Sequence, residues 1–371
     1  MSGIVQDKNV LDKDYSFARV YQPLNVSAKL KSRPEDFIVE EKISINFSNE
    51  GEHCWLYIKK RGCNTDWVAQ QLARFCGVKQ MAVSYAGLKD RHAVTSQWFS
   101  VQLPGLPTPD WSAFETLISV NNALGETVEV LECHRHNKKL QRGALKSNCF
   151  KITLRELSDT GDATYMLLKQ RCESLSTGGV PNYFGSQRFG RNHNNLDQAA
   201  KLFTNSRFRI SRQKRSMYYS AARSWLFNLI LSERIKCKIW DKRLPGDVFM
   251  LAGKSACFKD DFSEQLSDGD KTDLNERLQY NEIHPTAPLW GDGDAMVELD
   301  AANFERRIID QIPVYRDGLV SARVQSRRRA CRVIPAQLDC YRQGEDFVVS
   351  FSLPSGSYAT MVLAEIFSEL H

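Results

Sequence analysis

The chain has 371 residues, of which 42% are hydrophobic and 25% are charged. This composition is typical of a folded globular protein and excludes an intrinsically disordered chain. At roughly 150 residues per domain, the length predicts two or three domains. The formal net charge of +6 permits a nucleic-acid partner, although many enzymes without one are equally basic.

The ten cysteines lack the Cys-x-x-Cys spacing of a zinc ribbon or a redox pair. Residues 133–136, Cys-His-Arg-His, are the single local cluster of soft metal ligands, and adjacent ligands rarely complete a tetrahedral site. We therefore expect no metal, and free thiols in a reducing compartment. The first residues lack the apolar core of a secretion signal, and no apolar segment reaches the roughly 18 residues of a membrane span. These patterns predict a cytoplasmic protein.

The first half of the chain predicts a β-rich domain. Residues 1–29 are polar and weakly patterned, which indicates an irregular lead-in. Helices are expected after Asn64, a candidate cap followed by Thr65, and over 111–117. Segments rich in Ile, Val, Trp and Tyr predict strands over 37–45, 54–60, 81–85 and 97–103.

The segment 150–155 alternates strictly between apolar and polar residues. Phe150, Ile152 and Leu154 form the apolar face of the predicted strand. Alternation of this kind predicts an antiparallel sheet with one covered face.

The second half of the chain suggests an inserted domain. A helix over 164–175 ends at two glycines, and the segment 180–334 is then rich in helix patterns and arginine. An alternating strand over 346–353 and a final helix over 359–370 resume the earlier composition. We therefore predict one domain formed by 30–179 together with 335–371, interrupted by a domain at 180–334.

The loop Ala86–Thr95 carries the most informative chemistry. It places Asp90 between Lys89, Arg91 and His92, and positive neighbours lower the pKa of a carboxyl group. An ionised Asp can act as a nucleophile, and the cations can bind phosphates. The loop is thus a candidate active site for an enzyme acting on RNA or DNA, or else a solvated surface turn.

Two further segments carry rings and amides, and each has a structural alternative. Residues 180–190 contain aromatic rings and Arg188, which could stack on single-stranded nucleic acid or could anchor a hinge. In 146–150, Asn148 could bond to a pyrimidine edge, and Phe150 could stack on a base or belong to the core.

Two shorter segments are weaker candidates. Lys31 could pair with a catalytic carboxylate and Phe37 could wall a pocket, or both could belong to an ordinary strand entry. Tyr358 stands at the start of the last helix, where an N-cap is the alternative.

Basic segments at 138–146, 207–219 and 327–332 favour an RNA partner. They also support an alternative function, an RNA-binding or RNA-chaperone protein without catalysis. The chain lacks the Gly-x-Ser-x-Gly motif of hydrolases and the glycine-rich motifs that bind nucleotide phosphates. Hydrolytic and nucleotide-cofactor chemistry are therefore not expected.

Taken together and in this order, the motifs resemble those of the TruD-type pseudouridine synthases, bacterial branch, from about residue 30 to 370. The resemblance implies an α+β protein. Its catalytic domain would have the pseudouridine-synthase fold, with a mixed and largely antiparallel sheet. The domain at 180–334 would be the α+β insertion of that family.

The resemblance also implies the reaction, the isomerisation of uridine 13 in tRNA to pseudouridine without a metal or organic cofactor. It assigns Asp90 as the nucleophile, Lys31 as its ion-pair partner and Phe150 as the ring that stacks on the base. The remaining pocket residues would be Phe37, Asn148 and Tyr358. Position 358 more often holds Phe in bacterial members, so its hydroxyl could add a hydrogen bond. No membrane contact or protein partner is indicated, and a monomer is expected.

Overall fold

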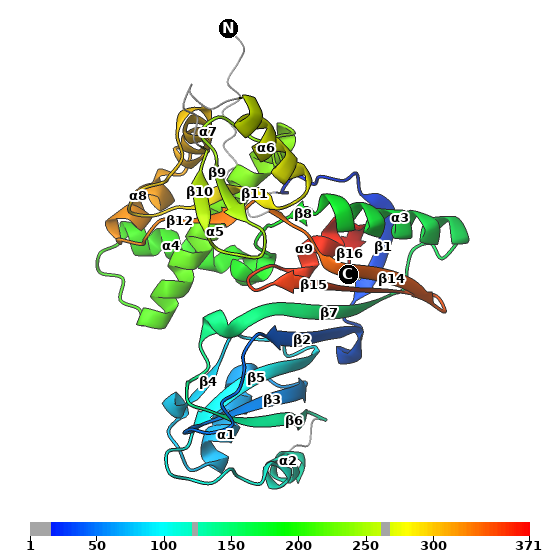
Figure 1. Cartoon of the computed structure of the whole chain (residues 1–371), viewed down its shortest axis with the longest axis vertical. Helices are drawn as coiled ribbons and strands as arrows, with labels where there is room; N and C mark the ends of the chain where they lie inside the picture. The colour runs from blue at the N-terminus through cyan, green and yellow to red at the C-terminus, as the bar shows by residue number, and fades with distance from the viewer. Residues whose placement is uncertain (1–15, 121–124, 261–267) are drawn as a thin grey trace. The chain divides into compact units, whose positions relative to one another are not determined.

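The computed structural model describes residues 16–120, 125–260 and 268–371, which form two compact units. The first, the sheet unit, comprises residues 24–176, 335–356 and 366–371. The second, the helical unit, comprises the described residues up to 23, together with 177–334 and 357–365. Figure 1 shows the elements of both units, coloured from the N-terminus to the C-terminus.

Within the described residues, the sheet unit contains a ten-stranded sheet with the central order β14-β15-β7-β2-β5-β3-β6. β1 pairs with β7 and β16, and β4 pairs with β5. The strands are β1 (Leu24–Leu30), β2 (Phe37–Ile43), β3 (His53–Arg61), β4 (Val83–Tyr85), β5 (Val94–Gln102), β6 (Thr127–His136), β7 (Leu145–Arg155), β14 (Ala336–Gln343), β15 (Asp346–Pro354) and β16 (Phe367–Leu370). The helices are α1 (Thr65–Phe75), α2 (Trp111–Val120) and α3 (Asp162–Gly178), whose last two residues belong to the helical unit.

The sheet is mixed and largely antiparallel, as expected. Among its described pairings, β1 with β16 and β2 with β5 are parallel, and the others are antiparallel. The alternation of β7 is also confirmed, because Ile152 and Leu154 are fully buried, whereas Phe150 remains partly exposed. Helices α1 and α2 pack on the sheet, with Leu72 and Phe114 fully buried.

Two expectations about the ends of the chain are wrong. Leu24 already begins β1, inside the segment expected to be irregular. The last helix, α9 (Ala359–Ala364), ends six residues before the expected Leu370, and β16 follows and pairs in parallel with β1. The pairing of β16 depends on a strand more than 300 residues earlier, so no local pattern predicts it.

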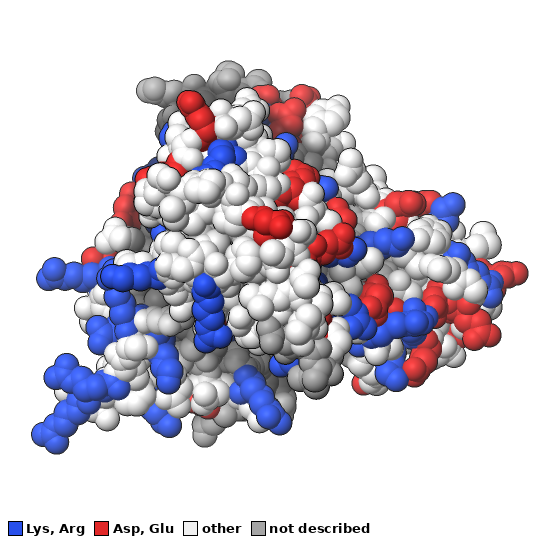
Figure 2. Space-filling view, turned by 90° about the horizontal axis from the view of Figure 1, so that it is seen from below, with Lys and Arg blue, Asp and Glu red and all other residues white. Residues whose placement is uncertain are grey.

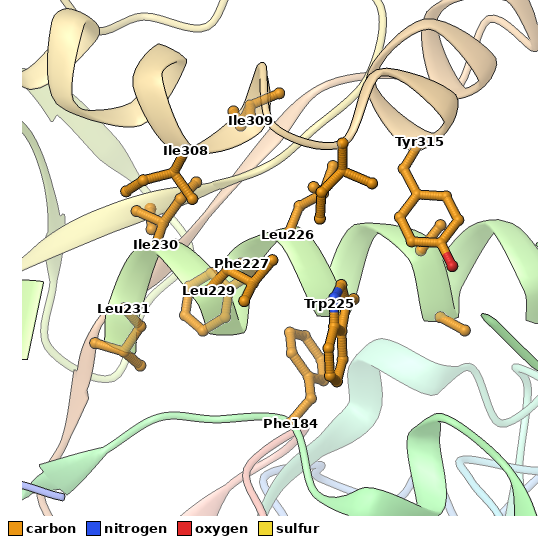
Figure 3. Packing of buried hydrophobic residues seen from close by; sticks show 14 of the residues in the cluster. Phe184, Trp225, Leu226, Phe227, Leu229, Ile230, Leu231, Ile308, Ile309 and Tyr315 are labelled. Carbon is orange, nitrogen blue, oxygen red and sulfur yellow. The ribbon is translucent and has the colours of Figure 1, made fainter. Parts of the chain in front are cut away.

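The helical unit is built around α5 (Arg212–Lys236). Residues 224–232 of α5 are all buried, so this part of the helix is covered on every side, mostly by apolar contacts (Figure 3). Its partners include Phe184, Ile308, Ile309 and Tyr315. The other helices are α4 (Asn194–Thr204), α6 (Asp268–Gln279), α7 (Leu299–Ile309), α8 (Pro313–Ser321) and α9.

The helical unit also holds two small antiparallel sheets, which makes it an α+β structure. One has the order β10-β9-β11-β12, and the other pairs β13 with β8. The strands are β8 (Val180–Pro181), β9 (Val248–Leu251), β10 (Cys257–Lys259), β11 (Ile283–Leu289), β12 (Arg327–Ala330) and β13 (Arg332–Val333). Among the helices described, none has the length and apolar character needed to cross a membrane.

Candidate active site

The loop that carries Asp90 connects β4 to β5, and two buried polar side chains brace it. Thr65, at the start of α1, accepts a hydrogen bond from the backbone N–H of Lys89 at 2.9 Å and donates one to Gln97 Oε1 at 2.8 Å. Gln97 in turn donates to the carbonyl oxygen of Gly87 at 3.2 Å. The hydroxyl of Thr65, adjacent to the expected cap, therefore fixes the loop.

Lys31 is the cation that contacts the Asp90 carboxylate. Its Nζ forms an ion pair with Asp90 Oδ2, and the backbone N–H of His92 donates to Asp90 Oδ1 at 3.0 Å. Burial would raise the pKa of Asp90, but the hydrogen bond and charge of Lys31 outweigh it and hold the pKa below its usual value of 3.8. The carboxylate is therefore ionised at neutral pH, and with 34% of its side-chain surface exposed it remains accessible.

The sequence neighbours of Asp90 contribute less than expected. The side chains of Lys89 and Arg91 form ion pairs with other acidic residues, at 2.9 and 3.0 Å. The charge on Asp90 therefore depends chiefly on Lys31, a residue 59 positions earlier in the chain.

A second lysine, Lys60 on β3, contacts the main chain of the loop and was not among the predicted residues. Its side chain is fully buried and donates to the carbonyl oxygens of Cys63 at 2.7 Å and Asp90 at 3.1 Å. Burial lowers the pKa of Lys60 to about 8. The sequence did indicate that Lys60 is buried, because it follows Leu56 and Ile58 at every second position of β3, on the face that points into the core.

Aromatic rings line the other side of the ion pair. The Lys31 ammonium lies 4.3 Å from the centroid of the Phe37 ring, a cation–π contact. Phe37 meets Phe150 edge to face at 6.2 Å, and Phe150 lies 5.5 Å from Phe351 on β15. Phe150 is the partly exposed member of this group, so its ring is available for a further contact.

Asn148 is joined to the Asp90 loop through Lys89. Lys89 Nζ donates to Asn148 Oδ1 at 2.5 Å and pairs with Glu41 Oε1 at 2.9 Å. Asn148 on β7 lies directly opposite Glu41 on β2 in the sheet register. Glu41 was not predicted as a site residue, because its position opposite Asn148 depends on this register, and Lys89 was expected only as a cation beside Asp90.

Tyr358 belongs to the helical unit, whereas the other five predicted site residues belong to the sheet unit. It occupies the N-cap position of α9, but its side chain makes no capping bond. Its hydroxyl instead accepts a hydrogen bond from Arg188 Nε at 3.0 Å, and its ring lies 6.0 Å from Phe184. The added hydroxyl thus has a partner within its own unit.

The rings of the segment 180–190 belong to the core of the helical unit. Tyr183, Phe184 and Phe189 are buried there, and Asn228 of α5 exchanges two 2.9 Å hydrogen bonds with the backbone of Phe184. These three rings are therefore structural and are not offered to a nucleic acid. Asn228 was missed because it lies in an apolar helix 44 residues away.

The arginines at 327–332 are also largely structural, contrary to the expectation of a phosphate-binding run. Arg328 is buried and forms a two-pronged ion pair with Glu305 at 2.6 and 2.9 Å. Arg329 bonds to the backbone and side chain of Asn182, at 3.0 and 2.6 Å, and Arg332 is buried. Arg327 is the exposed member of the run.

The basic segment 207–215 is exposed instead. Its cationic residues have no ion pair within the described part of the chain, and the segment leads into the first turn of α5. They are Arg207, Arg209, Arg212, Lys214 and Arg215. Figure 2 shows basic side chains gathered toward the left of one face with few acidic side chains among them, whereas the right of that face carries both signs.

The cluster at 133–136 is not a metal site in this structure. Within the described residues, no three His, Cys, Asp or Glu side chains are grouped so that they could bind a metal ion. Cys133 Sγ lies 3.3 Å from Cys54 Sγ and accepts a hydrogen bond from Trp111 Nε1 at 3.3 Å, while His134 stacks on Phe47 at 4.2 Å.

Comparison with known proteins identifies the family. The model of the family "tRNA pseudouridine synthase D (TruD)" matches residues 19–208 and 193–366. The chain is 43% identical to tRNA pseudouridine synthase D of Methylococcus capsulatus, over 94% of this chain and 93% of that protein. It is 40% identical to the Vibrio vulnificus protein of the same name, over 92% and 93%.

A solved structure has the same fold. The crystal structure of a protein assigned as tRNA pseudouridine synthase D from Methanosarcina mazei aligns with a TM-score of 0.67, covering 95% of this chain and 96% of that one at 22% identity. The chain therefore has the pseudouridine-synthase fold of that protein, and it belongs to the tRNA pseudouridine synthase D (TruD) family.

Proposed function

We propose that this protein is a tRNA pseudouridine synthase that isomerises uridine 13 of tRNA, with Asp90 as the nucleophile. Membership of the TruD family supports the reaction class. The observation that carries the assignment of Asp90 is its ion pair with Lys31, which keeps an accessible carboxylate charged beside an aromatic wall.

The reaction needs one carboxylate and no second acid. Asp90 attacks the flipped uridine at the ribose C1′ or the base C6, and the bond between C1′ and N1 of the base breaks. The base rotates, a new bond forms between C1′ and its C5, and the C5 proton is released while N1 gains a proton. Lys31 keeps the attacking oxygen charged and oriented.

The pocket residues would recognise the extruded base. Extrusion costs a few kcal/mol of stacking, which new contacts in the pocket must offset. Phe150 supplies a partly exposed ring for stacking, Phe37 walls the ion pair, and Asn148 presents an amide to the base edge. The predicted contribution of Tyr358 stays a prediction.

A tRNA partner is supported by the exposed basic segment at 207–215. Arginine and lysine without acidic partners attract the phosphate backbone and release its counterions. Binding through this segment would be independent of sequence, so the choice of uridine would rest on the pocket and on tRNA shape.

Release of tritium from tRNA labelled at uridine C5 tests the proposal directly, because the C5 proton leaves during isomerisation. The unaltered protein should release tritium, and Asp90→Asn should not. The folded state of Asp90→Asn should be checked by circular dichroism and its tRNA affinity by filter binding. Undiminished release by Asp90→Asn would remove Asp90 from the mechanism. A lack of release by the unaltered protein from unmodified tRNA would remove the enzymatic assignment.

A further inference from the structure

The orientation of the Asn148 side-chain amide is fixed by a buried ion pair. Lys89 Nζ lies 2.5 Å from Asn148 Oδ1 and 2.9 Å from Glu41 Oε1, so the ammonium bridges the two side chains. Asn148 is 8% exposed as a residue, and the Glu41 side chain is fully buried. The ion pair with Glu41 and the hydrogen bond to Asn148 therefore form where water cannot compete freely.

The pair itself is rigidly anchored. Glu41 Oε2 accepts a hydrogen bond from the backbone N–H of Trp98 at 2.9 Å, and the backbone N–H of Lys89 donates to Thr65 Oγ1 at 2.9 Å. Only 10% of the Lys89 side chain is exposed. Separating the two side chains would leave an uncompensated buried charge, so their separation is energetically costly.

The chemistry of the ammonium determines which end of the Asn148 amide it contacts. An ammonium is a donor only, whereas the amide has one acceptor oxygen and one donor nitrogen. A rotation of the amide by 180° would place the amino group of Asn148 against the positive charge of Lys89. The carbonyl end of the amide therefore faces Lys89, and the amino end faces away from it.

The amino end is free to bind a ligand. Asn148 Nδ2 has no hydrogen-bond partner in the described part of the chain, and it is not among the buried unpaired polar atoms there. It therefore keeps some exposure to solvent, next to Lys89 of the Asp90 loop. A donor in this position matches a carbonyl oxygen.

We propose that Glu41 and Lys89 are positioning residues that make Asn148 present a hydrogen-bond donor to a carbonyl oxygen of the target uracil. This inference rests on the proposed pseudouridine synthase function. If the carbonyl is O4, the same donor opposes cytosine, which carries an amino group at that position. The site would then select uridine by repulsion as well as by attraction.

The test uses three tRNA transcripts that carry uridine, 2-thiouridine or 4-thiouridine at the target position. Sulfur accepts hydrogen bonds poorly, so kcat/KM of the unaltered protein should fall about three- to tenfold for the analogue whose oxygen meets Asn148. In Asn148→Ala this bond is already absent, so kcat/KM should be lower with uridine and the sulfur effect at that position should vanish.

Variants of Lys89 test the positioning role. Lys89→Met frees the amide to rotate and should also abolish the sulfur effect, whereas Lys89→Arg, which keeps the donor, should retain it. Lys169→Met is a matched control at an exposed lysine outside the basic segments, and it should leave the ratio of kcat/KM for uridine to kcat/KM for the thiouridine unchanged. If Lys89→Met does not fold, as judged by circular dichroism, Lys89→Gln takes its place, because it also removes the positive charge that fixes the orientation of the Asn148 amide. A sulfur effect that persists in the folded variant would overturn the positioning role.

The inference would be overturned if the loss of kcat/KM caused by each sulfur substitution were the same in Asn148→Ala as in the unaltered protein. The proposed function would then stay intact. A lack of isomerisation of the uridine transcript by the unaltered protein would overturn the proposed function, and the inference with it. The two failures are therefore distinguishable. The first appears in the ratio of kcat/KM between the uridine and thiouridine transcripts, and the second in the isomerisation of the uridine transcript.

Discussion

At the residue scale, two lysines contact different atoms of Asp90 and act on it in different ways. Lys31 contacts the carboxylate and sets its charge, whereas Lys60 bonds to the Asp90 carbonyl oxygen and sets the position of the main chain. Lys31 retains some exposure, but Lys60 has none. The nucleophile therefore depends on one cation for its ionisation and on another for its placement.

The buried lysine predicts a specific pH dependence of stability. The pKa of Lys60 is about 8 in the folded protein and 10.5 ordinarily. Between these values the unfolded state binds more protons than the folded state, so the free energy of unfolding should rise with pH in this window. Lys60→Met removes this titration. Urea unfolding from pH 7 to 10.5 measures the free energy of unfolding of the unaltered protein and of Lys60→Met. The difference between the two should be constant below pH 8 and should change above it.

A difference between the two proteins that stays constant through pH 8 to 10.5 would contradict the burial argument. Activity provides an independent measurement, because Lys60→Met also leaves the Asp90 carbonyl oxygen without its donor. We expect kcat to fall more than the affinity for tRNA, since Lys60 acts on the placement of the reacting group.

At the element scale, sequence patterns predict strands well where the alternation is local. β7 and β15 follow their alternating residues, and the face of β3 that carries Lys60 could be identified in the same way. The residues alone suggested Lys31 as a partner for a catalytic carboxylate, and the family resemblance identified that carboxylate as Asp90, because the two residues meet only through the fold. The bridge between Glu41 and Asn148 could not be predicted, because it depends on the register between β2 and β7.

At strand β12 the sequence suggested a contact that the structure does not support. The basic run predicted RNA contacts, but most of its arginines are bonded within the protein. Glu305 on α7 supplies an acidic partner for the buried Arg328, 23 residues away, whereas the buried Arg332 bonds to His284 and to the carbonyl oxygen of Leu278. The side chains of Arg328 and Glu305 are 2% and 3% exposed. A charge pattern along the sequence does not reveal such a partner.

The Arg328–Glu305 pair predicts a large loss of stability when one partner is removed. Arg328→Met leaves Glu305 as a buried unpaired charge and should reduce the free energy of unfolding by about 3–5 kcal/mol. Replacing both residues, as Arg328→Met with Glu305→Leu, should recover much of that loss. Arg327→Met, at the exposed neighbour, should change stability by no more than about 0.5 kcal/mol.

Urea unfolding of the four proteins measures these differences. Equal effects of Arg328→Met and Arg327→Met would show that the pair contributes little. The same reasoning means that charge reversal at Arg328 would impair RNA binding by unfolding the protein, so it cannot test an RNA contact.

At the scale of the whole molecule, the net charge of +6 does not show which basic residues a partner can reach. Arg234 and Arg328 are neutralised internally by Asp247 and Glu305 and contribute little to the external field. The segment 207–215 keeps its charge unpaired within the described residues and exposes it at the start of α5. It is therefore the strongest candidate for contact with tRNA phosphates.

Neutralising this segment should weaken tRNA binding in a salt-dependent way. The triple variant Arg212→Gln, Lys214→Gln and Arg215→Gln should raise the Kd for tRNA. The slope of log affinity against log salt should become shallower by roughly 0.7–0.9 for each phosphate that the variant no longer neutralises. Filter binding between 50 and 200 mM salt measures both quantities at the roughly physiological range where such contacts matter. At saturating tRNA, kcat should change little, because none of the three residues belongs to the Asp90 site.

A matched control separates local contact from net charge. Lys79→Gln, Lys169→Gln and Arg306→Gln also remove three exposed positive charges, but these are scattered over the chain. If phosphates contact the segment at the start of α5, the control triple should retain a steeper salt slope than the first variant. Equal slopes for the two triples would show that tRNA responds only to overall charge. The contact with phosphates would then have to lie elsewhere, and the segment 207–215 would lose its proposed role.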